Sequence, residues 1–85
     1  MQILVAKQAK KDLEKIPKKI YQRISEDIFL LAENPFPLNS KKLHSEDSFY
    51  RMRIGDYRVV YQLNVKERII IVTKVKHRID CILSL

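Results

Sequence analysis

Two runs of alternating apolar and polar residues flank Gly55, the only glycine of the chain. Residues 49–54 and 57–64 alternate with the two-residue period of β-strands, and a Gly-Asp pair between such runs is typical of a two-residue hairpin. This turn predicts the following opposed pairs: Tyr50 and Tyr61, Met52 and Val59, Arg53 and Arg58, Ile54 and Tyr57. One face of the hairpin is then apolar, and the other carries the arginines.

Residues 2–7 form a short apolar run with β-branched side chains, which predicts a strand. Helical periodicity begins after this run. Apolar residues recur at helical spacing within residues 8–16, which predicts a short amphipathic helix. A second helix is predicted from Pro17 to Glu33, because proline suits the first helical turn and Asn34-Pro35 stops the pattern. The short connection between the two helices predicts an antiparallel helix hairpin with one shared apolar side.

The polar segment 38–48 has no period and is expected to be a loop. An apolar run that starts near residue 67 and ends at His77 predicts a further strand. A two-residue turn before it would bury Lys74 and Lys76, which is costly, so we expect a three-residue turn, Val65–Glu67. Lys74 then lies opposite Arg58, and the residues expected on the apolar face are Ile69, Ile71, Thr73 and Val75.

Together these elements predict a single α+β domain over residues 1–85, with the helix hairpin packed on a three- to four-stranded, mainly antiparallel sheet. Cys81 is the only cysteine, so the chain has no internal disulfide and no cysteine-rich zinc site. That usage suits a reducing compartment. No apolar run is long enough to span a bilayer, so we expect a cytoplasmic protein without membrane contact.

The formal charge of +7 is concentrated in the strand region, where residues 48–78 hold eight Lys and Arg against Asp56 and Glu67. A solvated polar face normally mixes both signs, and this one does not, which favours an anionic partner such as nucleic acid. The lack of nearby carboxylates argues against metal-dependent phosphoryl chemistry, so no metal or cofactor is expected. The cations that the strand pattern places on one face are Arg51, Arg53, Arg58, Lys74, Lys76 and Arg78.

The order of the elements, the segment Tyr-Arg-Met-Arg-Ile-Gly-Asp-Tyr-Arg-Val-Val-Tyr and the later Lys-His-Arg-Ile-Asp resemble the RelE/ParE toxin superfamily. The closest likeness is to the RelE-type mRNA interferases of toxin–antitoxin systems. The resemblance implies a RelE-like, microbial-RNase-like fold and a metal-independent endoribonuclease that cuts mRNA in the ribosomal A site and so inhibits translation. It also implies as partners the ribosome, mRNA and an antitoxin encoded nearby, with a monomeric free toxin and a hetero-oligomeric complex with the antitoxin.

The same resemblance implies that basic side chains carry the catalysis, and their predicted convergence on the strand face suggests which residue has which role. Arg58 is expected to stabilise the extra negative charge of the phosphorane, and either Lys74 or Lys76 to accept a proton. The catalytic candidates are Arg53, Arg58, Lys76 and Arg78. The candidates for RNA binding are Arg51, Arg53, Lys74, Lys41 and Lys42.

One position departs from the family pattern. Ile82 stands where strongly cleaving members often have a tyrosine, which implies attenuated cleavage. His77 is either an acid or base that compensates or a structural residue, and His44 is expected to be incidental. The alternative function is a non-cleaving, ParE-like or degenerate toxin that acts by binding its target or antitoxin. A general RNA-binding protein is disfavoured, because the sheet face lacks exposed aromatic side chains for base stacking.

Overall fold

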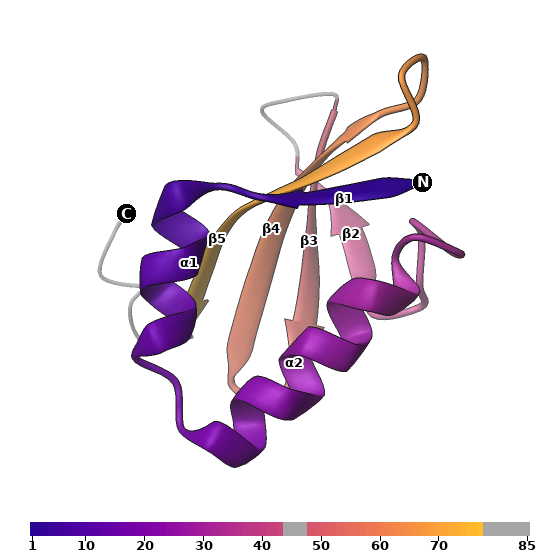
Figure 1. Ribbon diagram of the computed structural model, residues 1–85. Helices are drawn as coiled ribbons and strands as arrows, with labels where there is room; N and C mark the ends of the chain where they lie inside the picture. Colours follow the sequence, from indigo (N-terminus) through magenta and orange to yellow (C-terminus); the bar gives the residue numbers. More distant parts are fainter. Residues whose placement is uncertain (44–47, 78–85) are drawn as a thin grey trace.

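The computed structural model describes residues 1–43 and 48–77, and there two helices cover one face of a five-stranded sheet (Figure 1). The strands lie in the order β1-β5-β4-β3-β2, with β1 parallel to β5 and the other neighbours antiparallel. The predicted α+β class, with helices on a mainly antiparallel sheet, is confirmed. The elements along the chain are β1 (Gln2–Val5), α1 (Lys7–Glu14), α2 (Lys18–Leu30), β2 (Ser40–Lys42), β3 (Phe49–Ile54), β4 (Tyr57–Asn64) and β5 (Ile69–His77).

The sheet has five strands instead of three or four, because part of the predicted loop 38–48 is the edge strand β2. Lys41 pairs with Arg51 of β3, and the neighbouring residues follow in antiparallel register. The sequence of β2 gives no alternation to detect, since it reads Ser-Lys-Lys. A short, charged edge strand is a common protection against pairing with other chains.

A short connection over residues 15–17 joins the end of α1 to the start of α2, and the two helices diverge from it across the sheet (Figure 1). They run in roughly opposite directions, as the predicted hairpin requires, and α2 ends at Leu30 rather than at Glu33. Both bury an apolar stripe in the shared core, through Ala9 of α1 and through Ile24 and Ile28 of α2. Within the described part of the chain, neither helix is long and apolar enough to cross a membrane.

The β3–β4 hairpin has the predicted register at every pair, from Tyr50 opposite Tyr61 to Ile54 opposite Tyr57. Gly55 has a φ of 58°, and Asp56 has no positive φ, which is the pattern of a type II′ turn. Met52 and the other inward residues of the hairpin are buried against the helices. The glycine therefore fixes which side chains of the hairpin face outward.

The predicted register of β5 is wrong, because the connection to it is longer and the strand contains a β-bulge. Residues 65–68 form a four-residue connection, so Asn64 pairs with Ile69. Farther along, Val60 pairs with Lys74 and Tyr61 with Val72, so one extra residue lies in β5. A bulge of this kind breaks the alternation of faces.

Thr73 is the extra residue, and its Oγ1 donates a hydrogen bond of 3.0 Å to the carbonyl of Val60. The bulge puts Ile70 and Val72 in the core together with Val75, whereas Ile69, Ile71 and Thr73 are only half-buried. One strand thereby buries apolar residues on both sides of the bulge and still keeps its lysines out of the core.

Candidate functional site

Six cations belong by strand register to the sheet face opposite the helices, and they form two rows that cross the strands. In the first row Lys41 pairs with Arg51, and Val60 separates Arg51 from Lys74. The second row lies two residues away along β3, a distance of about 7 Å. In that row Arg58 lies between Arg53 and Lys76, and not opposite Lys74 as predicted. We call these six residues the basic face: Lys41, Arg51, Arg53, Arg58, Lys74 and Lys76.

Four of these cations line one depression of about 240 Å³, together with Leu38 and Asn39: Lys41, Arg51, Arg53 and Arg58. Its wall is held in place because the backbone N–H of Arg53 donates to the Asn39 carbonyl at 3.1 Å, and Asn39 Nδ2 donates to the Arg53 carbonyl at 2.6 Å. The Arg53 guanidinium also donates from Nε to the Gly55 carbonyl at 3.3 Å. The turn and the start of β2 therefore shape the depression.

The depression is rich in positive charge and poor in negative charge. Within residues 1–43 and 48–77, no ion pair neutralises Arg51, Arg53 or Arg58. Like charges directly across a sheet destabilise it, so the Arg53–Arg58 pair opposes folding in the absence of an anion. Guanidinium groups bind phosphate and carboxylate oxygens through paired N–H donors, which suits this cluster to a phosphate group.

Lys76 is the member of the basic face that has an acidic partner. Its Nζ lies 3.2 Å from Oδ1 of Asp12, a buried residue of α1. Burial raises the pKa of Asp12, but hydrogen bonds from the Val75 N–H, from Gln8 and from Lys76 outweigh it and hold that pKa below its ordinary 3.8. The carboxylate is therefore ionised at neutral pH, and its contact with Lys76 brings a negative charge to the edge of the basic face.

Some predicted residues do not join the basic face. Lys42 lies opposite Tyr50, so it belongs to the face of the sheet that carries the helices. Arg78, Ile82 and His44 lie outside the described residues, and their predicted roles stay predictions.

The aromatic and histidine side chains near the site lie on the core side. The rings of His77 and Tyr57 meet edge to face with centroids 5.1 Å apart. Tyr61 is completely buried, and its hydroxyl donates to the Pro35 carbonyl at 2.7 Å. Burial raises the pKa of Tyr61 above its ordinary 10.0, which fits a core role rather than a catalytic one.

Sequence reasoning missed Asp12 and Asn39 as residues that shape the site. Asp12 had a detectable signal, because it lies at helical spacing from Ala9 and Ile16, within an otherwise apolar stripe. A carboxylate in such a stripe needs a buried partner. Asn39 gave no signal, since its role depends on the undetected strand that follows it.

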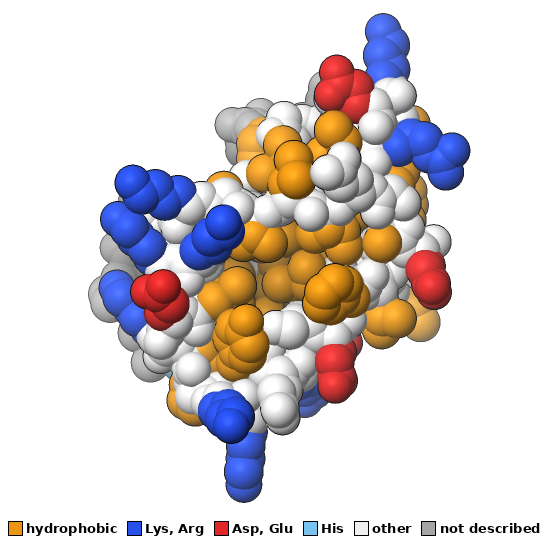
Figure 2. Space-filling model, in the orientation of Figure 1, with side chains coloured by type: hydrophobic (Ala, Val, Ile, Leu, Met, Phe, Trp, Pro, Cys, Tyr) orange, Lys and Arg blue, Asp and Glu red, His pale blue; other side chains and the backbone are white. Residues whose placement is uncertain are grey.

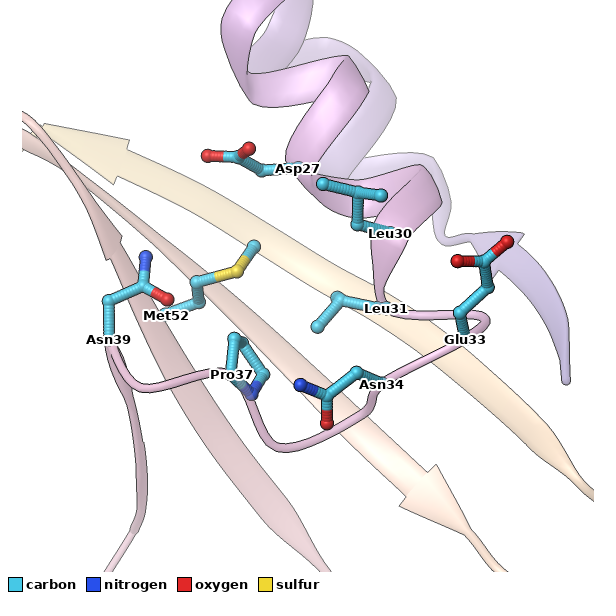
Figure 3. Close-up of a pocket in the computed structure, with 8 residues that line it drawn as sticks. All are labelled: Asp27, Leu30, Leu31, Glu33, Asn34, Pro37, Asn39 and Met52. Atoms are coloured by element: carbon cyan, nitrogen blue, oxygen red, sulfur yellow. The ribbon is translucent and has the colours of Figure 1, made fainter.

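Two other depressions lie on the helix side of the molecule. One, of about 400 Å³, is between the end of α2 and β3, where Met52 points from the strand toward the helix (Figure 3). Its acidic residues, Asp27 and Glu33, would repel a polyanion. The other, of about 520 Å³, is lined by Leu13 and Tyr21 among others, and Figure 2 shows apolar side chains on the hollowed surface between the helices.

A metal centre is not apparent in the described ranges, since residues 1–43 and 48–77 contain no group of three His, Cys, Asp or Glu side chains placed to hold an ion. The basic face itself presents ammonium and guanidinium groups, which carry fixed positive charge and N–H donors. Such groups stabilise an anion whose charge increases during a reaction.

Comparison with known proteins gives consistent matches over nearly the whole chain. Residues 3–80 match the family described as the ParE toxin of type II toxin–antitoxin system, parDE. A Methanocaldococcus jannaschii protein named RelE1 is 36% identical, over 87% of this chain and 86% of its own length. A chain of the archaeal RelE–RelB complex from Pyrococcus horikoshii OT3 has a TM-score of 0.81 at 35% identity, covering 91% of this chain and 93% of that one. A chain of the RelB–RelE antitoxin–toxin complex from Methanococcus jannaschii has a TM-score of 0.79 at 30% identity, covering 93% of this chain and 94% of that one.

Proposed function

The chain belongs to the ParE toxin family of type II toxin–antitoxin systems, within the RelE/ParE superfamily, and on this premise we propose that it is a metal-independent endoribonuclease. Its proposed substrate is mRNA in the ribosomal A site, and cleavage there inhibits translation in the cytoplasm. The observation that carries the proposal is the depression lined by Arg51, Arg53 and Arg58, whose charge no ion pair neutralises within the described residues. A phosphodiester supplies the missing negative charge.

The proposed reaction begins with attack of the 2′-hydroxyl of a nucleotide on its own 3′-phosphate. The 2′-hydroxyl loses a proton, the 5′-oxygen of the next nucleotide leaves and takes a proton, and a 2′,3′-cyclic phosphate remains. Negative charge increases on the phosphate oxygens in the transition state, and Arg58 is the group that we propose to stabilise it; its position between Arg53 and Lys76 supports this role. We propose Lys74 rather than Lys76 as the proton acceptor, because Lys76 contacts Asp12 and Lys74 has no ion pair in the described part of the chain.

An antitoxin is the second proposed partner. The structurally similar toxins named above were solved in complexes with RelB. Two surfaces of this chain suit a protein partner: the basic face suits an acidic segment, and the apolar hollow between the helices suits an amphipathic helix (Figure 2). We propose that the free toxin is monomeric and that it forms hetero-oligomers with its antitoxin.

Induced expression in bacteria, followed by primer extension on translated mRNA, tests this function. Wild-type protein should arrest growth and leave new ends in phase with codons. Arg58→Ala should abolish both effects without loss of fold, whereas Lys66→Ala, an exposed cation of the β4–β5 connection, should preserve them. Growth arrest without codon-phased ends would contradict cleavage and support the alternative, a ParE-like toxin that acts by binding its target.

A further inference from the structure

On the edge of β5 that faces away from β4, a side chain holds the end of the strand where no neighbouring strand reaches it. β1 pairs with β5 only over residues 69–72, and beyond them α1 lies along the same edge of the sheet (Figure 1). There Asp12 of α1 accepts a hydrogen bond from the Val75 N–H through Oδ2, at 3.0 Å. The carboxylate thus takes the place that a strand carbonyl would have at an open sheet edge.

The second oxygen of the same carboxylate holds a side chain of the basic face. Asp12 Oδ1 accepts from Lys76 Nζ at 3.2 Å and from Gln8 Nε2 at 2.9 Å. The Asp12 side chain is 5% exposed and the Lys76 side chain 35% exposed, so the contact joins a buried anion to a cation that solvent still reaches. An ammonium group has three N–H donors, so Lys76 can bind Asp12 and an external anion together.

From this geometry we propose that Asp12 is a positioning residue for the basic face: it fixes the Lys76 ammonium and the end of β5 beside Arg58. The proposal rests on the proposed ribonuclease function. A lysine side chain is flexible, and an ammonium that is already oriented stabilises a developing charge without further ordering. The predicted effect therefore falls on the rate of cleavage and not on binding of the ribosome.

A double-mutant cycle separates this role from a purely structural one. Asp12→Asn keeps an oxygen acceptor for the Val75 N–H and removes the charge that holds Lys76. With saturating mRNA-programmed ribosomes, it should lower the single-turnover rate about tenfold or more, with less than about a twofold change in affinity for the ribosome. In the Lys76→Met background, Asp12→Asn should have no further effect on the rate. An equal effect in both backgrounds would overturn the proposal and leave Asp12 as a structural residue.

A milder variant covers the case in which Asp12→Asn does not fold. Gln8 is exposed, so Gln8→Leu should fold normally while it releases one donor from Oδ1. It should slow cleavage only when Lys76 is present, and an equal slowing in the Lys76→Met background would again overturn the proposal.

Failure of the proposed function is distinguishable from failure of this inference. Absence of cleavage by the wild-type protein would reject the proposed ribonuclease function. The double-mutant cycle of Asp12 and Lys76 is then measured with the rate of growth arrest on induction in place of the rate of cleavage. Coupling between Asp12 and Lys76 in that measurement supports the positioning role, and additivity contradicts it.

Discussion

Removal of the Arg58 charge is expected to stabilise the fold while it abolishes function. Arg58 pairs directly with Arg53, and neither has an ion pair within the described residues. Lys76, on the other side of Arg58, is partly neutralised by Asp12, so the main repulsion is between the two arginines. Two unit charges about 6 Å apart in water repel each other by roughly 0.7 kcal/mol, which agrees with the range of about 0.2–1 kcal/mol for cross-strand pairs.

Comparison of Arg58→Gln with Arg58→Lys at two ionic strengths isolates this repulsion, because only lysine keeps the charge, and the difference in length between the two side chains does not depend on salt. The Debye length is about 30 Å at an ionic strength of about 0.01 M and about 3 Å at about 1 M. The stability of the glutamine variant relative to the lysine variant should therefore be about 0.5 kcal/mol higher at the low ionic strength than at the high one.

Urea denaturation at both ionic strengths measures these differences as shifts of the midpoint with an unchanged slope. Lys66→Gln in the exposed β4–β5 connection is the matched control and should show a smaller dependence on salt. A difference between the two variants that salt does not change, or one that shifts toward the lysine variant at low salt, would refute the argument from charge repulsion.

Three further predictions concern single contacts. Gly55→Ala should cost about 1–2 kcal/mol from backbone strain alone, because its Cβ meets no atom within 4 Å, and Gly55→Asn should cost less; urea midpoints give both values. The wild-type protein should be more stable than Asp12→Asn, and this difference in unfolding free energy should be complete above the ordinary Asp12 pKa of 3.8. It should be lost as the pH falls through the lower pKa that Asp12 has in the folded protein. A difference that persists in denaturation curves at lower pH would contradict this. Tyr61→Phe should cost about 0.5–1.5 kcal/mol of unfolding free energy, because it removes the bond to the Pro35 carbonyl.

The hairpin at the centre of the site was predictable because local chemistry determines it. Gly55 supplies the positive φ that the turn needs, and the alternation on both sides leaves one register that buries Met52 and Tyr61 together. Arg53 and Arg58 follow from that register without further information. The helices were predictable for a similar reason, since their apolar stripes are long and proline precedes α2.

The β5 register was not predictable from alternation, because the run of apolar residues at 69–72 fits either face. Because Thr73 is an extra residue in the strand, Val72 faces the core while Lys74, two residues later, faces solvent. A bulge of this kind has no signature in the sequence. The strand β2 was missed because its pairing is determined by β3 and not by its own residues. The register error placed Lys74 opposite Arg58 where the structure has Lys76, two positions farther along β5, and the face remains positively charged.

The most direct test of the account is the chemistry of the RNA ends left on ribosomes with a vacant A site. Purified wild-type protein should cut the codon and leave a 2′,3′-cyclic phosphate upstream and a 5′-hydroxyl downstream. Loss of one fixed donor typically slows such a step about 100- to 1,000-fold, so Arg58→Ala should lower the saturating rate by about that factor while its melting temperature stays near the wild-type value. A 3′-hydroxyl and 5′-phosphate at the cut, or wild-type cleavage by a folded Arg58→Ala protein, would contradict the account.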